Sequence, residues 1–179
     1  ELHCTDLCCE DMIARMPVTT EMINKWGISV EELDRIAQKN NPLLRPAWIR
    51  NMNEILSEVG FEACSDVMNG CDIIIISNEA SQDGAVVAMY PGIRETLNNM
   101  MGDEVYIIPS SIHECIAVPK SGVDLHCLYE IVREVNRTKV DEDDFLADDI
   151  LEYTQDGQLT SAIRRLEKES QIDEHNTFV

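Results

Sequence analysis

The sequence predicts an α+β domain, in which an N-terminal helical subdomain is followed by an antiparallel or mixed sheet of four to five strands with helices packed on it. Two observations predict this class. Apolar side chains recur at helical spacing through the first sixty residues, whereas short continuous apolar runs follow. The elements expected after residue 61 also run as strand-strand-helix-strand-strand-helix, an order that favours an α+β domain.

The helical subdomain is expected to cover residues 1–60. Ser29 and Glu32 have the spacing of a capping box, which marks the start of a helix. Pro42 is expected to end that helix, because proline interrupts helical hydrogen bonding. Together with the apolar spacing, these signals predict helices at 6–15, 20–26, 30–41 and 46–60.

The α+β domain is expected at 61–162, and a charged C-terminal tail at 163–179. Its first strand holds four consecutive isoleucines, which is typical of a strand buried on both faces. Amphipathic helices are expected from Pro91 to Gly102 and after Asp124. Short apolar runs between turn residues predict strands at 72–77, 85–90, 105–108, 115–118 and 150–154.

The composition narrows the classes of partner. Lys and Arg total 14 against 34 Asp and Glu, which gives a net charge of −20. The negative electrostatic field of this net charge repels phosphate groups, so neither nucleic acid nor an anionic membrane surface is expected as a partner. No apolar run is long enough to span a bilayer, and no signal peptide is expected. Seven cysteines, an odd number, then predict reduced thiols and a cytoplasmic location.

No metal and no cofactor are expected. Cys4, Cys8 and Cys9 form a cluster of soft ligands, but a zinc site usually pairs such cysteines with a second matching unit. The acidic run from 141 to 152 lacks the central glycine of a calcium loop, so a solvated acidic helix start is the preferred interpretation. The chain also has no glycine-rich loop for phosphate groups.

The candidates for catalysis are four polar residues between two predicted strands: Ser110, Ser111, His113 and Glu114. In an extended chain Ser111 and His113 point the same way, so a hydrolase with a serine nucleophile and a histidine base is one alternative. A working triad, however, normally gathers residues from distant parts of the sequence. We therefore favour a hairpin corner, where serine hydroxyls satisfy backbone groups and His113 bonds a carboxylate.

The candidates for ligand binding are Arg133 and Asn136, which lie one turn apart on the helix after Asp124 and away from its apolar stripe. No metal, nucleotide or nucleophile motif is specific enough to identify an enzyme. The leading hypothesis is therefore a non-catalytic cytoplasmic domain that acts by interaction with a protein or a small molecule. The partner is left unspecified, and the oligomeric state is left open.

A further alternative is a DNA-linked regulator, because the segment between Thr20 and Asn40 resembles a helix-turn-helix. Its second helix offers Glu31, Glu32 and Asp34 against two cations. Those carboxylates would repel the phosphate backbone, so a plain helical hairpin is the expectation.

Five motifs follow one another between residues 15 and 155: Pro17-Val18-Thr19-Thr20, Trp26-Gly27-Ile28-Ser29, Ala85 to Gly92, Tyr106 to Glu114, and Val132 to Asn136. In this order they resemble an uncharacterised bacterial family, a domain of unknown function that is common in gut Firmicutes. The Pro-Ser-Ser-x-His-Glu element also resembles a second uncharacterised Firmicute family. Neither resemblance implies an activity or any catalytic residue.

Overall fold

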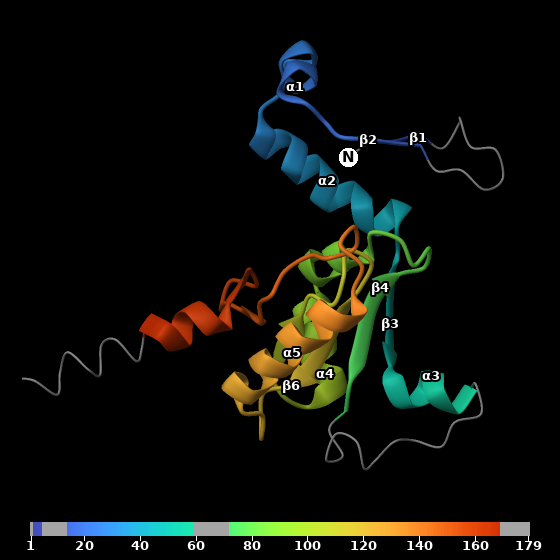
Figure 1. Ribbon diagram of the computed structural model, residues 1–179. Helices are drawn as coiled ribbons and strands as arrows, with labels where there is room; N and C mark the ends of the chain where they lie inside the picture. Colours follow the sequence, from blue (N-terminus) through green and yellow to red (C-terminus); the bar gives the residue numbers. More distant parts are fainter. Residues whose placement is uncertain (1, 5–13, 59–71, 169–179) are drawn as a thin grey trace, which may run out of the picture. The chain divides into compact units, whose positions relative to one another are not determined.

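The computed structural model describes residues 2–4, 14–58 and 72–168 of the chain (Figure 1). It divides into two compact units, Glu1–Asn41 and Pro42–Val179. Within the described part of the chain, none of the helices combines the length and the apolar character that crossing a membrane requires.

The first unit contains a small hairpin and two helices. β1 (Leu2–Cys4) pairs antiparallel with β2 (Ala14–Met16), and α1 (Thr20–Trp26) and α2 (Val30–Leu44) confirm two of the predicted helices. The helix predicted at 6–15 falls almost entirely outside the described residues, and its last two positions belong to β2. Neither α1 nor α2 has a buried residue.

The ends of α2 test two predictions. The Glu32 backbone N–H donates to Ser29 Oγ at 3.1 Å, so the predicted cap at the start is confirmed. The predicted end at Pro42 is wrong, because the helix continues through the proline to Leu44. Pro42 lies in the last turn, where its missing N–H removes a single bond before the helix ends.

A six-stranded sheet forms the centre of the second unit, and every neighbouring pair of strands is antiparallel. The predicted α+β class is confirmed, with six strands in place of four to five. In order across the sheet the strands are β3 (Ala47–Asn51), β4 (Ile74–Asn78), β6 (Cys115–Pro119), β5 (Val105–Ile108), β7 (Leu151–Tyr153) and β8 (Leu159–Ser161).

The helix predicted at 46–60 is wrong in its first half. Residues 47–51 form β3, and α3 (Met52–Glu58) begins only after it. In β3, Ile49 lies opposite Ile76 of the buried strand β4. Pairing with β4 therefore decides the local structure here, against an apolar spacing that fits a helix.

The strand predicted at 85–90 is also wrong. These residues form most of the 3-10 helix η2 (Gly84–Met89). Val87 and Tyr90 are buried three positions apart, whereas Val86 and Met89 are exposed, which matches the three-residue repeat of a 3-10 helix.

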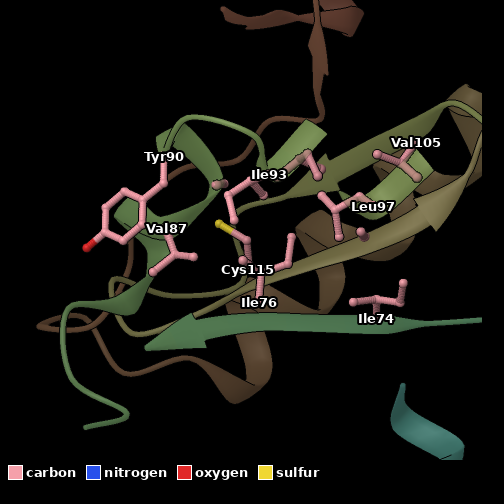
Figure 2. Packing of buried hydrophobic residues seen from close by; sticks show 11 residues of the cluster. Ile74, Ile76, Val87, Tyr90, Ile93, Leu97, Val105 and Cys115 are labelled. Atoms are coloured by element: carbon pink, nitrogen blue, oxygen red, sulfur yellow. The ribbon is translucent and has the colours of Figure 1, made fainter. Parts of the chain in front are cut away.

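The sheet is covered by helices on both faces. Along β5, Val105 and Ile107 pack against η2 and α4 (Ile93–Met101), and these residues belong to the core shown in Figure 2. Tyr106 and Ile108 point to the other face and pack with Leu125 and Val132 of α5 (Leu125–Lys139). The side-chain alternation of a strand thus divides the interior into two cores.

Candidate functional site

The residues predicted for catalysis form the corner between β5 and β6. Ser110, Ser111, His113 and Glu114 are all partly buried there, after the buried Pro109. The Ser111 backbone N–H donates to the Glu114 carbonyl at 3.2 Å, which closes the turn. The structure therefore confirms a polar hairpin corner at this place.

The imidazole of His113 is bound on both sides. Its Nδ1 accepts a hydrogen bond from the backbone N–H of Asp83 at 3.1 Å, and its Nε2 lies 3.1 Å from Asp144 Oδ1. A backbone N–H can only donate, so Nδ1 carries no proton in this arrangement. The neutral ring therefore holds its proton on Nε2 and donates it to Asp144, which is the carboxylate bond expected for His113.

The serine beside this ring is engaged differently from a nucleophile. Ser111 Oγ accepts a hydrogen bond from the backbone N–H of His113 at 3.1 Å. A general base must reach the hydroxyl proton with a free ring nitrogen. Both nitrogens of His113 face other partners, so the observed geometry holds the corner together and gives the hydrolase alternative no support.

A close backbone approach fixes the corner to the neighbouring loop. Ser77 Oγ donates to the His113 carbonyl at 2.8 Å, and the Ala85 N–H donates to the carbonyl of Ile112 at 3.2 Å. Gly84 fits between them because it has no side chain: a Cβ there would lie 2.5 Å from the His113 carbonyl oxygen. The glycine is required for space at this position.

The acidic run after α5 is a loop. Residues 141–150 contain a turn, a bend and irregular backbone, so the helix start predicted there is wrong. The reason is that its polar groups bond outward to other elements. The Ile112 N–H donates to the Asp144 carbonyl at 2.9 Å, beside the His113 bond, and Asn136 Nδ2 donates to the Ala147 carbonyl at 3.2 Å and to Asp148 Oδ1 at 2.9 Å.

A pocket of about 540 Å³ lies between α5 and this loop. Both predicted binding residues border it, whereas Ser111 and His113 do not. The predicted position of Asn136 away from the apolar stripe is wrong, because Asn136 is buried on the same face of α5 as Leu125 and Val132. We call it the α5 pocket, and its lining residues are Glu130, Arg133, Glu134, Asn136, Arg137, Val140, Glu142, Phe145 and Asp148.

The helix side of the α5 pocket carries balanced charges. Arg133 lies 3.6 Å from Glu130 and stacks over the Tyr129 ring, while Arg137 forms two short bonds with Glu134. These bonds raise the pKa of Arg137. Such exposed pairs are weak individually, yet each places a carboxylate beside a cation.

The loop side has the residues that the sequence did not indicate. The sequence predicts Glu142, Phe145 and Asp148 as part of an acidic helix, and no spacing in it indicates that Asp144 is the partner of His113. Phe145 is the available signal, because an aromatic residue inside an acidic run is unusual for a solvated face.

The most buried charge of the described residues lies away from the α5 pocket. Glu152 has a side chain 9% exposed, and it bonds Lys120 at 2.9 Å and the guanidinium of Arg165. Burial by itself raises the pKa of Glu152, but the hydrogen bonds from Arg165 and Lys120 outweigh it and place the pKa below its ordinary value. This network joins β7 to the end of β6 and has a structural role.

The cysteine side chains that the structure describes are not arranged as ligands. Cys115 is buried and Cys127 is exposed, and both are free thiols. Burial, with a smaller contribution from the charge of Glu114, raises the pKa of the Cys115 thiol to about 12. Cys8 and Cys9, with the side chain of Cys4, lie outside the described residues.

These features define an α+β domain with an antiparallel sheet, a helix-covered core on each face of that sheet and a polar pocket beside α5. The chain belongs to the Family of unknown function (DUF5688), which matches residues 6–155. The resemblance to an uncharacterised family is thereby confirmed, and its bacterial source stays a prediction. No curated protein and no solved structure matches the chain.

Proposed function

We propose that this domain is a binding module that takes a small ligand, or a short segment of a partner protein, into the α5 pocket. The pocket carries the proposal. Its volume of about 540 Å³ is in the range of small-molecule sites, and polar groups from a helix and from a loop converge on it. Arg133 and Asn136 are binding residues in this proposal.

The anchoring of the loop supports the proposal. Asp144 is bonded to the β5–β6 corner through His113 and Ile112, and Asp148 is bonded to α5 through Asn136. A loop bonded at two positions, Asp144 and Asp148, keeps its conformation before a ligand binds, and this reduces the conformational entropy lost on binding. The hairpin corner therefore has a positioning role in this account. We place the module in the cytoplasm because of its seven cysteines.

A titration followed by NMR tests this proposal. The isotope-labelled chain is mixed with a library of small polar fragments, and shifts are expected to cluster at α5 and residues 140–148. Arg133→Ala should weaken the fragments that bind. Arg35→Ala is the matched control, because Arg35 has the same type of i,i+3 acidic partner outside the pocket, Glu32 at 3.7 Å.

Two results would contradict the proposal. One is a set of shifts that excludes the α5 pocket. The other is covalent labelling by a fluorophosphonate probe that disappears in Ser111→Ala, which would establish a serine nucleophile and favour the hydrolase alternative.

A further inference from the structure

The side-chain amide of Asn136 has a fixed orientation. Its Nδ2 donates to the Ala147 carbonyl and to Asp148 Oδ1, both of which can only accept. The amide oxygen is therefore identified without ambiguity as the other atom of the group. It accepts no hydrogen bond from any described residue, although Asn136 is only 7% exposed and borders the α5 pocket.

This oxygen is not one of the buried side-chain atoms that lack a partner among the described residues, so it keeps contact with solvent. Because Asn136 lines the α5 pocket, an N–H or O–H group of a bound ligand can donate to this oxygen in place of water. The charges around the pocket decide which kind of donor is favoured.

The charges on the pocket walls narrow the chemistry of that donor. On the α5 side each guanidinium is beside a carboxylate, Arg133 with Glu130 and Arg137 with Glu134. On the loop side Glu142 makes no ion pair or hydrogen bond with the described residues, and Asp148 accepts only the bond from Asn136. The loop side thus keeps net negative charge that the pocket does not balance.

Apolar surface lies next to these acceptors. Phe145 is 44% exposed and Val140 is partly buried, and both line the pocket. An aromatic face also attracts a cation through its electron-rich ring. The wall therefore offers a place for a hydrocarbon stem beside places for a charged head.

We propose that the α5 pocket binds a primary ammonium or guanidinium group carried on an apolar stem. The head donates to Asn136 Oδ1 and to the carboxylates of Glu142 and Asp148, and the stem packs on Phe145 and Val140. A Lys or Arg side chain of a partner peptide and a free alkylamine share this chemistry. This inference rests on the binding function proposed above and adds the class of ligand to it.

Three blocked tripeptides test the ligand class by NMR titration: acetyl-Gly-Lys-Gly-amide, the same peptide with norleucine, and the same peptide with Glu. Norleucine keeps the stem of Lys without its charge. The Lys peptide should move the resonances of 136–148 and bind at least fivefold more tightly than the other two. Pentylamine separates the two sources, because a pocket for a peptide side chain binds it more weakly than the Lys peptide.

Glu142→Gln should weaken the Lys peptide about threefold to fivefold, as expected for one partly exposed ion pair. Asp143→Asn is the matched control, because it changes the net charge equally at an exposed neighbour that does not line the pocket. An equal loss in both variants would show that the overall charge of −20 attracts the peptide, and it would overturn the site.

The outcomes separate the two proposals. If the norleucine or Glu peptide moves the pocket resonances and the Lys peptide does not, the ligand class is overturned while the binding function stands. If none of the peptides, the amine or the library fragments moves the α5 resonances, both the binding function and the ligand class are overturned.

Discussion

Replacing Gly84 with Ala is the sharpest test of how the hairpin corner is packed. Gly84 is buried and is not one of the glycines with a positive φ, so the backbone itself would accept alanine. Without a clash, Gly→Ala stabilises a protein by about 0.4–1 kcal/mol, because the unfolded chain loses freedom. The sign of the effect therefore depends on space alone.

The structure leaves no space. The added Cβ would lie 2.5 Å from the His113 carbonyl oxygen and 2.8 Å from the Asn78 backbone nitrogen, and it would also overlap Ser77 Oγ. Two of these atoms belong to the backbone of paired strands or of the corner, so they cannot rotate away. Overpacking of this kind costs about 3 kcal/mol, which outweighs the gain in the unfolded state.

Urea unfolding followed by circular dichroism measures the change. Gly84→Ala should lower the free energy of unfolding by about 2–3 kcal/mol. Gly102→Ala is the control, since it has a φ of 67° and nothing within 4 Å, and only its strained backbone should cost about 1 kcal/mol. A Gly84→Ala protein as stable as the wild type would refute the close approach, and with it the proposed anchoring of His113.

Two further predictions concern titrating groups. Glu152→Gln should lower the free energy of unfolding by about 2 kcal/mol at pH 7, since it leaves Lys120 and Arg165 without their buried partner. The pKa of Glu152 in the folded protein is below its ordinary value of 4.5. The difference in the free energy of unfolding between wild type and variant should therefore be largest above pH 4.5 and disappear as the pH falls through the folded pKa. A difference that stays constant in urea titrations from pH 7 to pH 3 would contradict this prediction. Iodoacetamide at pH 8 should label Cys127 and leave Cys115 unmodified until urea unfolds the chain, because the pKa of Cys115 is about 12; peptide mass spectrometry distinguishes the two, and equal labelling in the native protein would show that Cys115 is accessible.

Much of the sheet could be predicted because its signals are local. The isoleucines of β4 and the apolar runs of β5 and β6 give strands within a few residues of those observed. β3 was missed for a non-local reason. Its side chains fit both the helical and the strand period. Pairing with β4 decides between them, and the paired residues nearest in sequence, Asn51 and Ile74, are 23 positions apart.

The candidate site could be predicted only on its helical side. The sequence marks Arg133 and Asn136 as polar positions of α5 and predicts both to lie away from its apolar stripe. That is wrong for Asn136, which is buried in line with Leu125 and Val132, whereas Arg133 is exposed. Glu142 and Asp148 belong to a loop whose path depends on bonds to His113 and Asn136, which come from other elements. The helix preference of an acidic run gave the wrong structure there because such bonds cannot be inferred from spacing.

The two attachments of the loop have a consequence for how this family can vary. Asp144 and Asp148 are tied to the rest of the domain, whereas Glu142 and Phe145 project from the same loop without such bonds. Under the proposed binding function, exchange of Glu142 and Phe145 would alter ligand preference and leave the framework intact. We therefore expect relatives to retain the tied positions, Asp144 and Asp148, and to diverge at the untied ones, which an alignment of the family would test.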